Sequence, residues 1–102
     1  MDKKLQVVQA KELRSEIIER LYDFYGEEIA VSTIKTLLRY NKNYYSDKDI
    51  KRALCYLSGE EKAYIYIKAN LDDYWDSLVQ LTPLGINLAE GDIKDMGVLS
   101  DE

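Results

Sequence analysis

The sequence contains no histidine and only one cysteine among its 102 residues. The absence of histidine excludes the usual serine and cysteine triads and removes the most common general base. One cysteine without histidine cannot build a structural zinc site and cannot form an internal disulfide. We therefore expect a protein of the reducing cytoplasm that is not an enzyme and holds no metal or cofactor.

Long hydrophobic runs are also missing. No stretch approaches the ~20 consecutive apolar residues of a membrane span. Residues 1–5 lead into a charged segment that lacks the apolar centre of a signal peptide. With 46% hydrophobic and 32% charged residues, the composition is that of a soluble globular protein with one modest core. We expect most of the nine tyrosines to fill half-buried positions.

The net charge of −5 is unevenly distributed along the chain. Residues 69–102 contain one lysine and eight acidic residues, whereas residues 1–68 have a net charge of +2. Residues 31–58 contain six basic and two acidic residues. The average charge argues against nucleic acid as a partner, so any such surface must lie in this middle segment.

Residues 46–59 are the clearest predicted element, a helix with two unlike faces. Ser46 can cap the amide of Asp49, and acidic residues in the first turn favour a helix N-terminus. We expect Gly59 to end the helix in the left-handed conformation. One predicted face is apolar and fixes the helix in the core: Ile50, Ala53, Leu54 and Leu57. The opposite face carries Lys48, Arg52 and Cys55, flanked by Lys51 and Tyr56.

Three segments precede this helix. Residues 3–25 predict a long helix ended by Gly26, and its first turns, with Leu5 and Val8, suggest packing on a second copy. Residues 28–31 are a candidate minimal strand. Ser32 is expected to cap a helix over residues 33–40, and residues 41–45 form the following turn.

A predicted hairpin follows, with strands over residues 62–68 and 77–81. Thr82 and Pro83 then start a short helix that Gly91 ends. We expect residues 92–98 to form an ordered turn around Ile93 and Met96, and residues 99–102 to be a frayed acidic tail. This order predicts an α+β winged helix-turn-helix: three helices, a two-stranded wing hairpin and a short C-terminal helix, in a single domain over residues 1–98.

The segment Leu81-Thr82-Pro83-Leu84-Gly85-Ile86-Asn87-Leu88-Ala89-Glu90-Gly91 looks like the ending common in small winged-helix proteins. With Gly97-Val98 it resembles a group of small ArsR-like proteins encoded in Mu-like phages and prophages. The chain departs from the pattern of that group at Met96, where a proline is usual, and in its acidic end. The resemblance implies a winged-helix fold and a phage-related origin rather than an activity.

Such a fold suggests a DNA-binding or transcription-regulatory module. The start of the third helix would enter the major groove of double-stranded DNA, and the second helix would cross the phosphates. The candidate DNA-binding residues are Lys35, Arg39, Lys42, Tyr44, Lys48, Lys51 and Arg52. Two acidic groups of residues oppose this function: Asp47 and Asp49 at the helix start, and Asp72, Asp73 and Asp76 in the wing.

The alternative is a winged helix that no longer binds DNA and serves as a protein-interaction adaptor. The candidate interface residues on the hairpin are Tyr64, Tyr66, Tyr74 and Trp75. We expect Ile65 and Ile67 to face the core and the two strand tyrosines to be half-exposed. Trp75 is either the interface anchor or folded back on the core.

Two further features are candidates for chemistry. The aspartates of the wing could attract a cation, but hard-ion loops need more oxygen ligands at a more regular spacing, so we expect no metal there. Cys55 lies beside Arg52, which favours its thiolate, so the thiol is either a redox switch or incidental.

Overall fold

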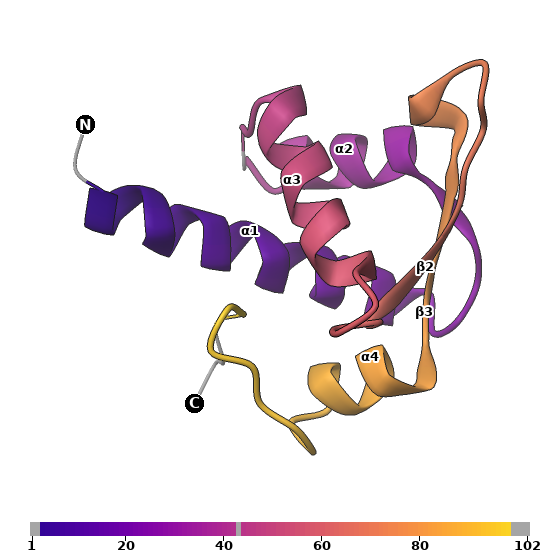
Figure 1. The fold of residues 1–102 in the computed structure, drawn as a ribbon. Helices are drawn as coiled ribbons and strands as arrows, with labels where there is room; N and C mark the ends of the chain where they lie inside the picture. Colours follow the sequence, from indigo (N-terminus) through magenta and orange to yellow (C-terminus); the bar gives the residue numbers. More distant parts are fainter. Residues whose placement is uncertain (1–2, 43, 99–102) are drawn as a thin grey trace.

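The structure is a computed structural model that describes residues 3–42 and 44–98. The described chain is an α+β fold with four α-helices and a three-stranded antiparallel sheet (Figure 1). In chain order the elements are α1 (Lys3–Asp23), β1 (Ile29–Ala30), α2 (Val31–Tyr40), α3 (Asp47–Ser58), β2 (Ile65–Lys68), the 3₁₀ turn η1 (Tyr74–Asp76), β3 (Leu78–Leu81) and α4 (Pro83–Ala89). The expected order of elements is confirmed, and the expected tail over residues 99–102 lies outside the described residues.

The sheet has the strand order β1-β3-β2. Val79 of β3 lies opposite Ile29 on one side and Ile67 on the other, so the minimal strand expected at residues 28–31 is confirmed. The helices α1, α2 and α3 enclose the core with this sheet. The largest fully buried side chains come from all three helices, from β3 and from Ser77, the residue before β3: Leu13, Ile17, Leu21, Val31, Ile34, Leu38, Ile50, Leu54, Leu57, Val79 and Ser77.

Three local expectations are wrong. Ser32 does not cap α2, because the helix already begins at Val31, whose amide donates to the Ser77 carbonyl at 2.9 Å. Gly59 follows α3 in an extended conformation, with φ −59° and ψ 152°. The left-handed residue of this connection is Ala63, with φ 51°. The strand expected from residue 62 therefore begins only at Ile65.

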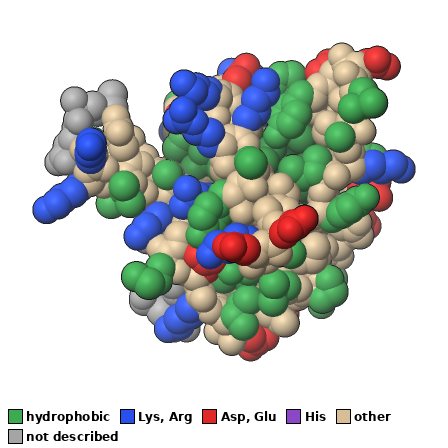
Figure 2. Space-filling model, in the orientation of Figure 1, with side chains coloured by type: hydrophobic (Ala, Val, Ile, Leu, Met, Phe, Trp, Pro, Cys, Tyr) green, Lys and Arg blue, Asp and Glu red, His purple; other side chains and the backbone are tan. Residues whose placement is uncertain are grey.

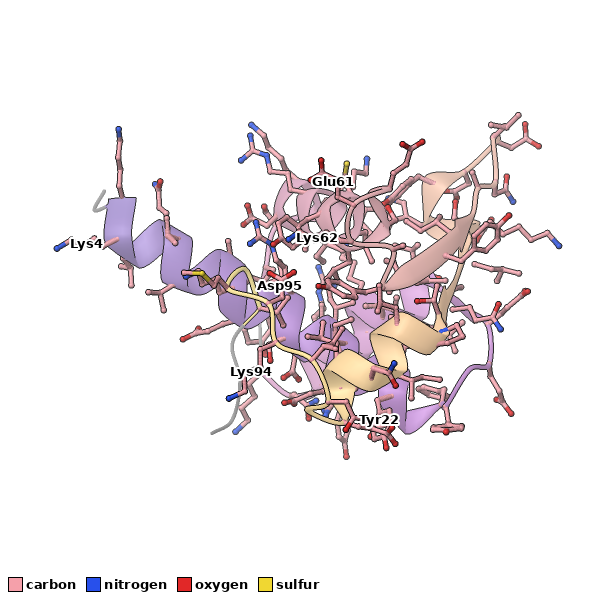
Figure 3. All side chains as sticks on the ribbon, turned by 60° about the horizontal axis from the view of Figure 1, so that its bottom comes forward. Lys4, Tyr22, Glu61, Lys62, Lys94 and Asp95 are labelled. Carbon is pink, nitrogen blue, oxygen red and sulfur yellow. The ribbon has the colours of Figure 1, made fainter. Side chains whose placement is uncertain are left out.

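The C-terminal segment, residues 90–98, folds back against α1 and α3 (Figure 3). Its anchor is Asp95, whose side chain is 4% exposed, whereas Met96 is 92% exposed. The Asp95 carboxylate accepts hydrogen bonds from the Tyr64 hydroxyl at 2.6 Å and the Tyr56 hydroxyl at 2.9 Å. Lys62, next to Asp95 in Figure 3, places its Nζ 3.0 Å from the same carboxylate. The expected ordered turn is therefore centred on Asp95 rather than on Met96.

These contacts change the protonation behaviour of Asp95. Burial alone would raise the pKa of its carboxyl. Hydrogen bonds from Tyr64, the Gly97 amide, Lys62 and Tyr56 outweigh burial and hold this pKa well below its usual range. Burial, together with the hydrogen bond to this carboxylate, raises the pKa of Tyr64 to about 12.

Candidate nucleic-acid interface

The outer face of α3 carries the basic residues expected there. The helix starts because the Asp49 amide donates to the Ser46 side chain at 3.1 Å, and it is fixed because Ile50 and Leu54 are 1% and 0% exposed. Lys48, Lys51 and Arg52 consequently face solvent. Figure 2 shows Lys and Arg side chains gathered over the first turns of α3.

Charge balance on this surface favours a net positive potential. The Lys35 Nζ lies 2.6 Å from the Asp47 carboxylate, so one of the two opposing aspartates is already neutralised within the chain. Four other candidate cations are exposed and form no ion pair with an acidic residue in the described part of the chain: Arg39, Lys42, Lys48 and Arg52. Their charge is therefore available to a polyanion.

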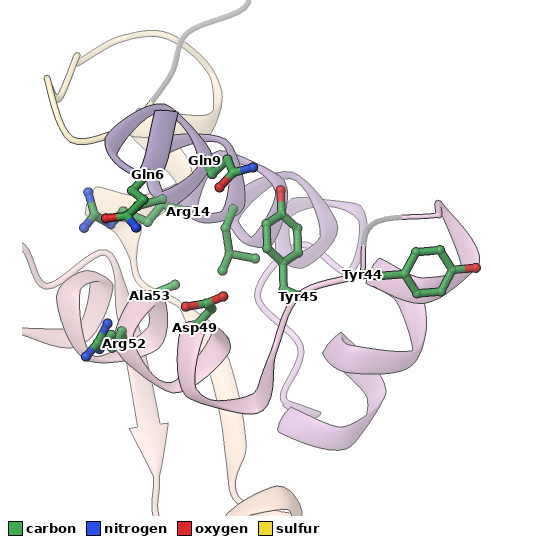
Figure 4. Close-up of a pocket in the computed structure, with 10 residues that line it drawn as sticks. Gln6, Gln9, Arg14, Tyr44, Tyr45, Asp49, Arg52 and Ala53 are labelled. Carbon is green, nitrogen blue, oxygen red and sulfur yellow. The ribbon is translucent and has the colours of Figure 1, made fainter. Parts of the chain in front are cut away.

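The end of α2 and the turn that follows it present two exposed tyrosines. Tyr44 is 77% exposed and points away from Tyr45 in Figure 4. Tyr40, the last residue of α2, is 85% exposed and was not among the expected site residues. Its position beside Arg39 could have indicated it, because Tyr and Arg side chains both donate hydrogen bonds to phosphate oxygens. Lys42 between them is exposed and adopts a left-handed φ of 62°.

A groove of about 610 Å³ separates the N-terminal half of α1 from α3. Arg52 of α3 and Arg14 of α1 lie at one end of it in Figure 4, and Asp49 and Tyr45 line its middle. Arg14 is held in place because its guanidinium stacks 3.9 Å from the Tyr56 ring centroid. The groove therefore lies directly beside the candidate DNA-binding surface, and charged, polar and apolar side chains line it.

The loop of the hairpin folds onto the helices. The Lys35 Nζ lies 4.8 Å from the Trp75 ring centroid, and the Lys51 Nζ lies 5.1 Å from that of Tyr74. The two rings pack edge to face with centroids 5.6 Å apart. Ser77, which is 1% exposed, fixes the loop because its hydroxyl accepts from the Asn70 amide at 2.9 Å.

We call Lys35, Lys51, Tyr74 and Trp75 the aromatic clamp. Cations over aromatic faces are attracted by the ring quadrupole. Two of the expected DNA-binding lysines thus also hold the hairpin against α2 and α3, which sequence reasoning missed. Of the two alternatives for Trp75, the structure has the one in which the side chain folds back.

The expected exposure of Tyr64 is wrong. Tyr64 is only 6% exposed, because the left-handed Ala63 interrupts the strand alternation before β2 and turns this ring inward. Tyr66 is 62% exposed, as expected for an interface residue. Leu71 in the hairpin loop is 98% exposed and was not expected as part of this surface.

Removal of the aromatic clamp should be detectable through Trp75, the only tryptophan. A Lys35→Ala, Lys51→Ala variant is expected to shift Trp75 fluorescence to the red and to lower the free energy of unfolding by about 1 kcal/mol, because three cation–π contacts and the partly exposed Lys35–Asp47 ion pair are lost. Urea titrations followed by fluorescence measure both quantities. Lys48→Ala is the matched control, and an equal red shift in that variant would contradict the clamp.

The remaining candidate sites are the acidic residues of the hairpin loop and Cys55, in the part of the chain that the structure describes. They contain no group of three Cys, Asp or Glu side chains placed to hold a metal ion. The Asp73 carboxylate instead accepts from the Trp75 amide at 2.9 Å. Cys55 is an exposed free thiol. None of the helices in the described ranges is both long and apolar enough to cross a membrane.

No protein-family model, curated protein or solved structure matches the chain.

Proposed function

We propose that this protein is a small winged-helix module that binds double-stranded DNA through α3 and the turn before it. The observation that carries the proposal is the exposed basic surface of Arg39, Lys42, Lys48 and Arg52, with Asp47 neutralised by Lys35. In this function Lys48 and Arg52 reach base edges or backbone, and Arg39 and Lys42 lie near phosphates.

The element order is compatible with this fold. Two helices joined by a short turn, α2 and α3, are followed by the antiparallel β2–β3 hairpin, with α1 packed behind both helices. In a winged helix the second helix of such a pair enters the major groove. The similarity of residues 78–98 to small phage-encoded winged-helix proteins supports the same proposal and suggests a phage-related origin.

The hairpin loop is expected to stay away from DNA. Asp72, Asp73 and Asp76 are exposed there and repel phosphate. Lys51, which could offset them, faces the rings of the aromatic clamp. DNA contacts should therefore be confined to α3, the turn and the end of α2, and non-specific affinity should be low.

Charge reversal on α3 should abolish most of the binding. Lys48→Glu with Arg52→Glu is expected to weaken binding to a labelled duplex at least tenfold at low salt, because two contacts become repulsions. Fluorescence anisotropy at low and moderate salt measures this. Lys68→Glu with Lys94→Glu is the matched control, since it removes the same amount of positive charge away from α3. Equal losses in both double variants, or no binding at low salt, would contradict the proposal.

The salt dependence of binding is a second, independent test, because it measures the number of phosphate contacts. With about four phosphate contacts, the logarithm of the association constant should fall with the logarithm of salt concentration with a slope of about −3.6. Loss of two contacts should reduce the slope to about −1.8. Titrations at several salt concentrations give both slopes, and an unchanged slope in the α3 variant would place the contacts elsewhere.

A protein-interaction adaptor is the second candidate. It is favoured by the exposed side chains of Tyr66 on β2 and of Leu71 in the hairpin loop, which also carries the three exposed aspartates. Such a surface fits a partner with a basic rim and an apolar centre. It would be the function to pursue if the protein fails to bind any duplex at low salt.

A further inference from the structure

The groove between α1 and α3 has a positive end and a negative middle. Arg52 and Arg14 lie at one end, and Asp49 lies between that end and Tyr45 (Figure 4). Arg14 is a fixed positive charge there, because its Nη1 donates to the Gly97 carbonyl at 3.0 Å. The pKa of Tyr45 is raised first by burial and then by nearby carboxylates, Asp49 among them, so the middle of the groove is electronegative.

The two groove charges on α3 are neighbours that do not pair with each other. Asp49 and Arg52 are three residues apart and therefore share one face of the helix. Both are exposed, and neither forms an ion pair within residues 3–42 and 44–98. Each is therefore able to bind a ligand group of the opposite charge.

The rest of the lining is apolar and aromatic. Leu13 and Ala53, which are buried, contribute apolar surface from α1 and α3, and the half-buried Tyr45 ring lies beside them. A flat apolar group packs well on such a surface. The volume of about 610 Å³ falls in the range of ~300–1,000 Å³ that is usual for small-molecule sites.

We propose that this groove binds a free aromatic α-amino acid. Such a molecule carries an ammonium and a carboxylate on one carbon atom, so the first can meet Asp49 while the second meets Arg52. Its side chain then lies on Leu13 and Ala53 beside the Tyr45 ring. A phosphate would be repelled by the aspartate and a simple cation by the two arginines, whereas a zwitterion matches both signs of charge.

Occupation of the groove should also affect the proposed DNA-binding surface, because Arg52 belongs to both. A carboxylate bound to this guanidinium competes with a phosphate or base for it. The amino acid and DNA should therefore weaken each other's binding by the same factor. This effect rests on the proposed function, whereas the amino-acid site does not.

Titration of the full chain with L-phenylalanine, followed by ¹H–¹⁵N NMR, tests the inference. We expect a dissociation constant of about 1 mM or lower, with the largest changes at the amides of Leu13, Asp49 and Ala53. Asp49→Asn and Arg52→Gln should each raise the dissociation constant at least tenfold. Asp47→Asn is the matched control, since it removes the same charge from the first turn of α3 outside the groove and should leave the constant unchanged.

Two analogues separate the roles of the two charges. L-phenylalaninamide lacks the carboxylate, so it should bind weakly and lose nothing further in Arg52→Gln. N-acetyl-L-phenylalanine lacks the ammonium, so it should bind weakly and lose nothing further in Asp49→Asn. No change up to about 20 mM L-phenylalanine, or equal affinity for all three compounds, would overturn the inference. Circular dichroism confirms that each variant is folded.

Fluorescence anisotropy with a labelled duplex measures the effect on DNA. Saturating L-phenylalanine should weaken binding about fivefold and reduce the salt slope from about −3.6 to about −2.7, because one contact is lost. Unchanged DNA affinity at saturation would overturn the link between the two sites. If the protein binds no duplex at low salt, the proposed function fails, and the NMR titration still decides whether the groove binds the amino acid.

Discussion

Replacing Asp95 by alanine is expected to lower the free energy of unfolding by about 3 kcal/mol, and Tm by roughly 12–24 °C. The reason is that one carboxylate, 4% exposed, accepts from the hydroxyls of Tyr56 and Tyr64 and from the Gly97 amide, and pairs with Lys62. Alanine would leave these donors without their acceptor in a half-buried site. It would also release the segment that places Val98 in the core.

Urea titration measures this loss, and Asp92→Ala is its matched control. Asp92 lies in the same segment but is exposed, so its substitution should stay within about 0.5 kcal/mol of the original protein. A double-mutant cycle with Tyr64→Phe should be strongly non-additive, because both changes remove the same hydrogen bond. Equal stability of the Asp92 and Asp95 variants would show that this carboxylate does not hold the segment.

The same site predicts a pH dependence at both extremes. Because the folded protein holds the Asp95 pKa below its usual value of 3.8, the stabilisation is fully present above that pH and is lost as the pH falls below it. The pKa of Tyr64 is raised from 10.0 to about 12, so its contribution is present below pH 10 and is lost between pH 10 and 12. Tm measured across pH should show both losses in the original protein and a flatter acid side in Asp95→Ala.

The helices and the hairpin are predictable because their signals are local. α3 has its cap at Ser46 and an apolar stripe at helical spacing, and α4 starts at the Thr82–Pro83 pair as expected. The exposed basic face of α3 follows from the same spacing, because burying Ile50 and Leu54 leaves Lys48 and Arg52 outside. Periodicity alone therefore predicts most of the candidate DNA-binding surface.

What could not be predicted depends on contacts between distant residues. The charge distribution groups Asp95 with the acidic end of the chain, yet its partners Tyr56 and Tyr64 lie 39 and 31 positions earlier. The contact of Lys35 with Trp75 likewise joins α2 to a loop 40 positions later, and no local pattern indicates it. Both differences have one cause, since charge counts and helical spacing are local, whereas tertiary pairing decides which of these side chains are buried or paired.

Replacing Gly85 by alanine is expected to destabilise the protein by about 3 kcal/mol, at the upper end of the effects of overpacking. A methyl group at this position of α4 would collide with the carbonyl oxygen of Tyr64 and lie 2.7 Å from Leu81 Cδ2. The Tyr64 carbonyl is backbone and already accepts from the Thr82 amide at 3.1 Å, so it cannot move aside without breaking the junction of α4 with the sheet.

Gly59→Ala is the matched control for this prediction. Gly59 has a φ of −59°, which alanine adopts easily, and its added methyl would meet only ordinary contacts of 3.5 Å or more. Urea titration should therefore find the Gly59 variant within about 0.5 kcal/mol of the original protein. Movement of Tyr64 in Gly85→Ala would also displace its hydroxyl from Asp95, so combining Gly85→Ala with Asp95→Ala should cost less than the sum of the two. Strict additivity would mean that α4 and the C-terminal segment are fixed independently.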